Sequence, residues 1–363
     1  MNDLTKKYDN WFESTGPAAL VIREHLIPVE GADGVLFPAT FAPSEDKKTF
    51  EGGYNIDAFS DGTNVCLIDS VGSQANRIEP LFMAKEYAGL VPQIVVKAGT
   101  KSVNLLEAGH RAGDAIIRCS TLQQEFHTAF KALQNGNAEP LATIAPTSLV
   151  FGAWDSRDTQ AKLPRLIDSK IRAFNVRKLT RSASYVVQQH IDYVKEGLLA
   201  EPLSDAEKKL LSTRGYLNAL ASATHGGVIA TGGIRRDASF HLAALRLLTA
   251  SSAEKTLALR RYVLGLSLTA LTAPPAGYLR QGCNLVLDPD QPTEFKVVFN
   301  NGRREDAAIT HEDALLYAKA AAKEYGIDTE RQIDFKSGPD KEVLFDKELA
   351  KKDVNDAIKK KSK

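Results

Sequence analysis

The chain has 363 residues, which is room for two domains or for one core that carries a large insertion. Its 46 basic and 45 acidic side chains leave a formal net charge of +1, and this balance excludes a polycation that coats nucleic acid over its whole surface. The three cysteines are far apart and lie in apolar runs, so we expect structural thiols in a reducing cytoplasm.

The N-terminal segment, residues 1–16, contains acidic side chains and lacks the apolar core of an ordinary signal peptide. No uncharged apolar stretch reaches the ~18 residues of a membrane span. We therefore expect a cytoplasmic protein with no membrane partner.

The first predicted elements are a short amphipathic helix over residues 3–14 and a strand over 18–29, where polar and apolar residues alternate. Residues 30–63 are rich in Gly, Pro, Asp and Lys, and they predict an extended excursion with the character of a hairpin. A second apolar strand, 64–69, leads directly into a helix.

The start of this helix is the most informative part of the sequence. Small residues at positions 70, 72 and 73 leave backbone N–H groups open, and the positive end of a helix dipole favours phosphate there. The candidate phosphate ligands are Ser73, Gln74, Asn76 and Arg77. No nucleophile with an adjacent base accompanies them, so the pattern indicates that a phosphate chain is held rather than cut.

The helix is predicted to be interrupted at Pro80, which lies too deep to be a first-turn proline. It should kink there or restart over 80–87. A short apolar strand over 92–97 and helical spacing over 104–133 follow.

A basic segment follows in the middle of the chain. Between residues 149 and 190, eight Lys and Arg side chains face three Asp side chains, a local excess of five positive charges. Such a segment is either a solvated surface or the track of an extended phosphate backbone, and the spacing of the cations suits the second. The candidates within it are Arg157, Lys162, Arg165 and Arg172.

The second half of the chain is predicted to begin with a helix over 205–222, because Ser204 and Glu207 have capping-box spacing. The later predicted elements are a capped helix from Ser251 to about Leu271, strands over 283–287 and 294–299, a helix that Thr310 starts and Gly326 ends, and a charge-rich tail. Interleaved strands and helices predict an α/β or α+β core.

A glycine-flanked strand over 226–236 is expected to end in a basic turn at Arg235 and Arg236. This turn would directly precede a helix over 240–249, whose cap candidates are Asp237 and Ser239. Two guanidiniums beside a helix N-terminus favour a phosphate grip.

The histidines lack the spacing of a metal site, and Ser73 lacks the sequence context of a hydrolase nucleophile. Aromatic residues are sparse, with Trp154 beside the basic segment, so backbone contacts and sequence-neutral recognition should dominate any grip on nucleic acid. Two other functions stay open. One is an α/β enzyme that acts on a phosphorylated small molecule with His110 or His225, and the other is a metal-independent ribonuclease with a histidine pair.

Five segments resemble the backbone RAMP subunit of type I CRISPR interference complexes (Cascade), specifically the type I-G branch, formerly called I-U. They are LIDSVGSQANRIE at 67–79, HRAGDAIIRCS at 110–120, FGAWDSRDTQAKLPRLIDSKIRA at 151–173, GGIRRDASFHLAALRLL at 232–248 and YLRQGCNLV at 278–286. The Ser-Gln pair followed by Arg at a helix start is also similar to the motif that other type I backbone subunits place against guide RNA.

The resemblance implies an α+β fold, a modified RRM-like (ferredoxin-type) palm with an inserted helical fingers region and a protruding β-hairpin thumb. The implied division is 1–96 as the first part of the palm with the excursion 30–63, 97–200 as the fingers-like region with the basic segment 151–181, 201–310 as the second part of the palm, and 311–363 as the C-terminal helix and charged tail. Residues 30–63 and 281–305 are both candidates for the thumb.

The resemblance further implies a non-catalytic subunit with no metal or other cofactor. Its partners would be CRISPR RNA, the target DNA strand, further copies of itself and other Cascade subunits. Copies would stack head to tail along the guide spacer, and each thumb would interrupt the base stack. Arg111 and Arg280, from two of the five segments, join the RNA-binding set, and Arg235 with Arg236 would form a second phosphate clamp. We expect all these ligands to converge into one groove.

Overall fold

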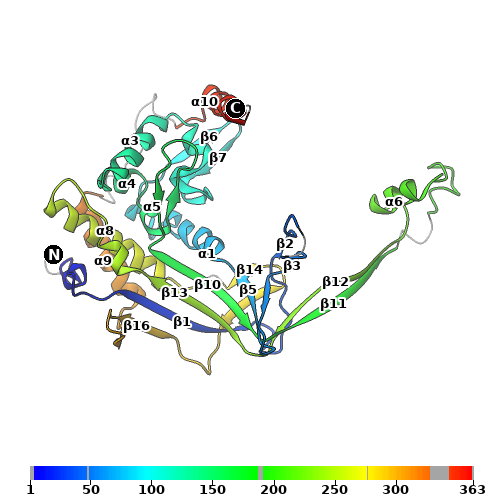
Figure 1. Cartoon of the computed structure of the whole chain (residues 1–363), viewed down its shortest axis with the longest axis horizontal. Coiled ribbons are helices and arrows are strands. Elements are labelled where there is room, and N and C mark those ends of the chain that lie inside the picture. Colours follow the sequence, from blue (N-terminus) through cyan, green and yellow to red (C-terminus); the bar gives the residue numbers. More distant parts are fainter. Residues whose placement is uncertain (1–3, 47–48, 187–190, 276, 328–342, 362–363) are drawn as a thin grey trace.

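A computed structural model describes residues 4–46, 49–186, 191–275, 277–327 and 343–361. Parts of the predicted ranges lie outside the described residues, namely 3 in the first helix, 47–48 in the excursion, 187–190 in the fingers-like region, and 328–342 and 362–363 in the C-terminal part. Figure 1 shows helices gathered on one side of a curved sheet, and a long arm that projects away from this body.

Within the described residues, nine strands form the main sheet, and their pairings are antiparallel. The order along its main path is β14-β15-β1-β13-β10-β5-β4, while β16 pairs with β1 and β17 with β16. The strands are β1 (Ala19–Pro28), β4 (Ile56–Ala58), β5 (Asn64–Asp69), β10 (Ile167–Phe174), β13 (Ile234–Phe240), β14 (Tyr278–Arg280), β15 (Cys283–Leu287), β16 (Glu294–Val298) and β17 (Arg304–Asp306). The predicted strands at 18–29, 64–69, 283–287 and 294–299 are confirmed.

Four of these strands follow the chain order strand, helices, strand, strand, helix, strand. They are β1, β10, β13 and β16, and they lie side by side in the order β16-β1-β13-β10. A β-α-β-β-α-β connection of this kind is the ferredoxin-like arrangement. The α+β class is therefore confirmed, and the topology is compatible with an RRM-like palm.

The helices are α1 (Val71–Ile78), α2 (Ala115–Arg118), α3 (Gln123–Gln134), α4 (Glu139–Ile144), α5 (Pro146–Phe151), α6 (Asp205–Thr213), α7 (Leu242–Leu245), α8 (Ala253–Thr272), α9 (His311–Tyr325) and α10 (Lys347–Lys361). The capping box of Thr310 and the left-handed Gly326 bound α9 as predicted. Helix α8 passes so close to α9 that a Cβ on Gly265 would lie 2.7 Å from the Cα of Ala318. Among the described residues, no helix is long and apolar enough to cross a membrane.

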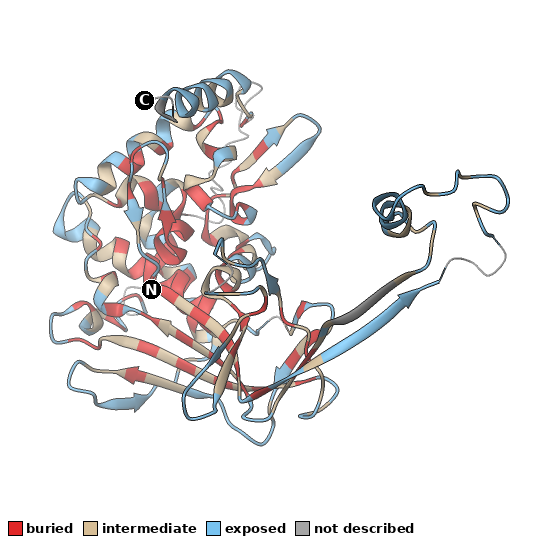
Figure 2. Ribbon diagram, turned by 45° about the vertical axis from the view of Figure 1, so that its right-hand side comes forward, coloured by how far each residue is buried: buried red, intermediate tan, exposed pale blue. Residues whose placement is uncertain are grey.

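The main sheet has two unlike faces, because side chains alternate along each strand. Every second residue of β1, β10 and β13 is buried, and these residues form what we call the covered face (Figure 2). Leu20 and Phe240 on this face join the core shared with α8. The residues between them are partly exposed and form the open face. The position of a charged residue along its strand therefore decides whether its side chain lies on the covered face or on the open face.

The arm consists of β11 (Val176–Tyr185) and β12 (Ala219–Ala230), with α6 near its tip (Figure 1). It extends the connection between β10 and β13, and the sequence did not predict it. Residues 281–305, one candidate for the thumb, instead contribute β15 and β16 to the main sheet. The other candidate, 30–63, packs at the base of the arm, where the Gly227 N–H donates to Tyr54 Oη at 3.0 Å.

Three helix predictions need correction. The first helix is only a 3₁₀ turn, Asp9–Phe12, and α6 stops at Thr213, while residues 219–222 belong to β12. Asp237 and Ser239 do not cap a helix over 240–249, since both lie in β13. Residues Ile234–Phe240 form the strand β13 because β1 pairs with one edge of it and β10 with the other.

The range 97–200, predicted as the fingers-like region, contains elements of several parts of the fold. Helices α2 to α5 fall in the range 97–200, but so do the arm strand β11 and β10, which pairs with β13 and β5 in the main sheet. Residues of the predicted charged tail form α10, and the segment before it bridges to Lys97 and Ser120. The small two-stranded ladders are β2 (Thr40–Phe41) with β3 (Gly53–Tyr54), β6 (Val95–Ala98) with β7 (Lys101–Asn104), and β8 (Ala153–Trp154) with β9 (Lys162–Leu163).

Candidate nucleic-acid interface

Helix α1 begins where the sequence predicted, directly after β5. Ser70 is its N-cap, and the Ser70 hydroxyl accepts a hydrogen bond from the Ser73 backbone N–H at 3.2 Å. The helix ends at Ile78, and Pro80 lies in the short 3₁₀ helix Glu79–Met83, so the predicted interruption is confirmed. Asn76 and Arg77 are on the exposed side of α1.

Gln74 does not face the solvent with its neighbours. Its side chain is buried, and its Nε2 donates to Asp69 Oδ2 at 2.6 Å. Its Oε1 accepts from the Ser169 hydroxyl of β10 at 2.9 Å. The Arg77 Nε donates to the same Asp69 oxygen at 3.1 Å, yet the Arg77 side chain keeps 33% of its surface exposed. Gln74 therefore fixes α1 on the sheet, whereas Arg77 stays accessible to a ligand.

Arg111 is buried as well, with only 3% of its side chain exposed. Its Nε lies 2.5 Å from Glu79 Oε2, and its Nη2 donates to Asn76 Oδ1 at 3.1 Å. Burial raises the pKa of the Glu79 carboxyl to about 7, against the lowering effect of the Arg111 charge. Arg111 thus links the 3₁₀ helix after α1 to Asn76 and orients that amide.

Arg165 is exposed and lies beside the start of α1. A Cβ built on Gly72 would be 3.8 Å from Arg165 Nη2. On the other side, a Cβ on Gly152 would come within 2.9 Å of Arg165 Cγ, and Gly152 has a φ of +77°. A glycine at position 152 therefore lets the β8–β9 ladder approach the stem of Arg165. The guanidinium makes no ion pair with any residue that the structure describes.

Arg280 belongs to β14, and its strand neighbour Leu279 lines a cavity together with Arg77. Burial raises the pKa of the Cys283 thiol to about 11, and the charges of Arg280 and Arg77 both act on this thiol in the opposite direction. We call the accessible set around this helix the α1 group; its members are Ser73, Asn76, Arg77, Arg165 and Arg280.

Arg235 and Arg236 point to opposite faces of the main sheet, as neighbours in a strand must. Arg236 is on the covered face, where its Nε lies 2.5 Å from Glu24 Oε2 and its side chain is 4% exposed. It lines a cavity of about 200 Å³ together with Gln74 and Arg77. Arg235 is on the open face, so the predicted double clamp does not form.

The open face carries a separate cluster around one carboxylate. Asp237 pairs with Arg235 at 2.9 Å, Arg172 at 3.3 Å and Arg23 at 3.4 Å. Burial alone would raise the pKa of Asp237, but the hydrogen bonds and charges of the three guanidiniums lower it. Arg23 also pairs with Glu294 at 3.5 Å, so three cations and two anions leave a local excess of one positive charge. We call Arg23, Arg172 and Arg235 the open-face group.

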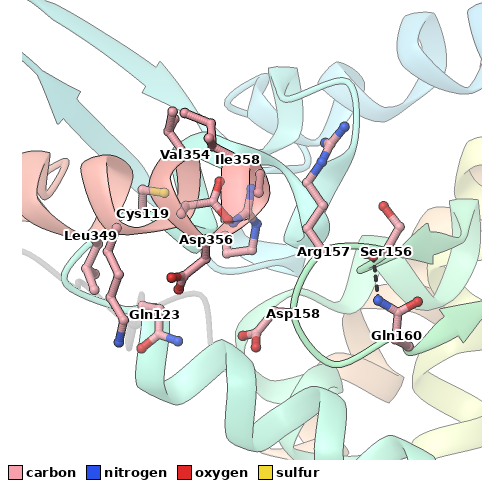
Figure 3. A pocket seen from close by; sticks show the side chains of 14 residues that line it. Cys119, Gln123, Ser156, Arg157, Asp158, Gln160, Leu349, Val354, Asp356 and Ile358 are labelled. Atoms are coloured by element: carbon pink, nitrogen blue, oxygen red, sulfur yellow. Dashed lines mark hydrogen bonds and ion pairs between the residues drawn. The ribbon is translucent and has the colours of Figure 1, made fainter. Parts of the chain in front are cut away.

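Arg157 and Lys162 lie on the loop and strand after β8. Arg157 lines a cavity of about 630 Å³ between this loop and α10, where Figure 3 shows it on the side opposite Val354 and Ile358. Lys162 lies over the Trp154 ring, with 5.6 Å from its Nζ to the ring centre. The predicted single groove is therefore wrong in part, because Arg77, Arg157 and Arg235 occupy three different regions.

Sequence reasoning missed the partners that decide these placements. It did not select Asp69, Glu79 or Glu24, the carboxylates that hold Arg77, Arg111 and Arg236. Arg23 could have been found, since the alternation of β1 places it on the open side of the strand. The arm cations Arg177, Lys178 and Arg181 contributed to the charge excess but were not chosen. Among the described residues, no His, Cys, Asp and Glu side chains gather in a set of three or more that could hold a metal ion.

Comparison with known proteins gives one family match. Residues 20–178 match the family model CRISPR-associated protein GSU0053 (Cas_GSU0053). This region contains β1, α1, β10 and the β8–β9 loop, whereas β13 and β14 lie beyond it. No curated protein matches the chain.

Proposed function

We propose that this chain is a non-catalytic, RNA-binding backbone subunit of a cytoplasmic type I-G effector complex, and the similarity of residues 20–178 to a CRISPR-associated family supports this proposal. The observation that carries the proposal is the α1 group. Donors from separate parts of the chain lie along α1, with Arg165 beside its capped start, where the positive end of the helix favours phosphate, and Arg77 in its last turn.

Guide RNA would lie along α1 with its phosphates toward the cations. Arg165 is next to the first turn and Arg77 is in the last turn, and Arg280 of β14 would add a further cation. Asn76 offers its amide from the same exposed side, oriented by Arg111. These are contacts to phosphate and sugar, so recognition would not depend on base sequence. The bases would remain available for pairing with a target DNA strand.

The arm is our candidate for the thumb. Its strands stand away from the body (Figure 1), and its basic residues Arg177, Lys178 and Arg181 are exposed. An arm of this kind can reach a second copy stacked head to tail. Identical copies joined by unlike surfaces form an open helix rather than a closed ring, which suits a filament along the guide spacer. Helices α2 to α5 would be the fingers and the main sheet the palm.

The open-face group lies on the other side of the palm from α1 and cannot grip the same stretch of guide RNA. We assign Arg172 and Arg235 to a second partner in the complex, the target strand or another subunit. Lys162, which pairs with Trp154 in the β8–β9 ladder, would extend the cationic surface from Arg165, whereas Arg157 faces the cavity beside α10.

Electrophoretic mobility shifts with spacer-length single-stranded RNA test the proposal. Arg77→Ala and Arg165→Ala should each weaken RNA binding while the fold is kept, because each removes a cation from the α1 group. Arg303→Ala is the matched control, since Arg303 is an exposed arginine paired with Glu305 on the β16–β17 turn. Equal affinity of all four proteins at several salt concentrations would argue against the α1 group as the guide site.

The same RNA separates the rival functions. A ribonuclease would shorten the RNA during incubation, and His110→Ala or His225→Ala would stop this. Copurifying RNA of one discrete CRISPR-like length supports the filament subunit. A chain that purifies without RNA in the presence of its partner subunits, and binds none afterwards, is not a guide-binding backbone.

A further inference from the structure

Trp154 is an exposed aromatic side chain for which the fold gives no packing reason. The residue ends the two-residue strand β8 and is 57% exposed. The neighbouring residues Ala153 and Asp155 are both buried. The indole is therefore presented to the solvent from a segment whose backbone is held on both sides.

The scaffold behind Trp154 is tightly constrained. The 3₁₀ helix Arg111–Gly113 packs against its backbone so closely that a Cβ on Gly113 would lie 2.8 Å from the Trp154 carbonyl oxygen. The Asp155 carboxylate accepts from the Thr159 N–H at 2.8 Å and from the Thr159 hydroxyl at 2.6 Å. The loop that follows Trp154 is thus closed by internal hydrogen bonds, and the backbone that carries the indole is held in place before any ligand arrives.

Cations flank the indole on the side that leads to α1. Lys162 is paired with Trp154 across the β8–β9 ladder, and its Nζ lies 5.6 Å from the ring centre. Arg165 follows three residues later and touches the start of α1. The Gly152 carbonyl accepts a hydrogen bond from the same Arg111 that orients Asn76. Trp154 is therefore connected to the α1 group through a short, rigid path of protein contacts.

We propose that Trp154 is a stacking platform for one base of the bound single-stranded RNA, and that Lys162 and Arg165 neutralise the phosphates flanking that base. This inference rests on the proposed function and adds a base contact to a site otherwise made of phosphate ligands. Stacking tolerates any sequence because every base has a π face, so the platform fits sequence-neutral recognition. A flat, immobile indole loses little side-chain freedom when a base covers it.

Tryptophan fluorescence tests the inference directly, because the chain has two tryptophans, Trp11 and Trp154. Trp11 packs against Tyr8, with 4.4 Å between ring centres, and Trp11→Phe leaves Trp154 as the one reporter. Titration of this variant with oligouridine should quench the emission. Inorganic polyphosphate should bind to the same cations without quenching, since it has no bases.

Affinity measured by mobility shift gives the second readout. Trp154→Ala should bind oligouridine about 5- to 150-fold more weakly, the range expected for the loss of one stacked base, and Trp154→Phe should keep most of the affinity. Circular dichroism checks that both variants are folded. Unchanged affinity of Trp154→Ala, or binding of oligouridine without quenching in the Trp11→Phe variant, overturns the stacking role and leaves the proposed function standing. Failure of the unsubstituted protein to bind RNA refutes both.

Discussion

The buried pair of Glu79 and Arg111 gives the sharpest prediction, because it connects the stability of the fold to the orientation of Asn76. Their side chains are 1% and 3% exposed, with 2.5 Å between Oε2 and Nε. Arg111→Met removes the cation, keeps most of the side-chain volume and strands the Glu79 carboxylate in the interior. Breaking a buried ion pair from one side costs about 3–5 kcal/mol.

A loss of this size corresponds to a fall in melting temperature of about 4–7 °C, because unfolding 363 residues at ~2.1 cal/mol/K per residue has an entropy of about 0.76 kcal/mol/K. Urea denaturation followed by circular dichroism measures the loss of unfolding free energy. Arg303→Met is the matched control. The Arg303 side chain is 57% exposed beside Glu305, and the control should cost no more than about 1 kcal/mol.

The double variant Glu79→Leu/Arg111→Met decides whether the stranded charge is the cause. Replacing both partners by apolar side chains should recover most of the stability, since a buried pair contributes little net stability over well-packed apolar groups. The folded protein also raises the pKa of Glu79 from 4.5 to about 7, so the folded state holds this proton more tightly than the unfolded state. Stability from this group is present below pH 4.5 and is lost as the pH rises to about 7, and in Arg111→Met the loss should extend to higher pH because the Arg111 charge no longer lowers this pKa. The reasoning fails if the single variant costs less than ~1 kcal/mol or if the double variant is no more stable than the single one.

Three further outcomes follow from the same contacts. Ser70→Ala removes the N-cap of α1 and should cost ~1 kcal/mol in urea denaturation, while Ser70→Asp should retain the cap. Arg165→Ala should lower the steepness of log affinity against log salt for single-stranded RNA by about 0.7, the contribution of one neutralised phosphate, and an unchanged slope would exclude a phosphate contact. Asp237→Asn should flatten the acid limb of the stability profile, because the folded state lowers the pKa of Asp237 and its stabilising effect is lost as the pH falls through that value; parallel acid limbs for both proteins would contradict this.

The elements that the sequence predicted well are those with a periodic apolar face or a defined cap. Strand β1 alternates buried and partly exposed residues over its whole length, and α9 has both a capping box and a C-terminal glycine. The start of α1 was also predictable, because Ser70 caps a helix that follows an apolar strand. These signals are local, so one sequence is enough to find them.

The arm carried no such signal. Past Val176, the residues of β11 are exposed or only partly buried, since a free-standing ribbon has solvent on both sides. The alternation that identifies a half-buried strand is therefore absent. Basic residues in this stretch add to a charge excess but do not reveal which element they belong to.

Strand β13 was misread for a different physical reason. Arg235, Arg236 and Asp237 are charged on consecutive positions, which is typical of a turn or a helix start and not of a sheet interior. Arg236 is tolerated on the covered face only because Glu24, 212 residues away in sequence, pairs with it. A long-range partner of this kind leaves no trace in the local pattern.

The separation of the cations also limits what one copy can do. The eight cations of the segment 149–190 are divided among the β8–β9 region, β10 and the arm, so they cannot all act on one phosphate path. A single copy then offers only the α1 group and its extension through Arg165 to one stretch of RNA. Each neutralised phosphate contributes a similar electrostatic increment, so a short set of contacts gives modest, salt-sensitive affinity. Under the proposed function, a continuous grip requires that the next copy supply the next set, and assembly along the RNA would then be the source of tight binding.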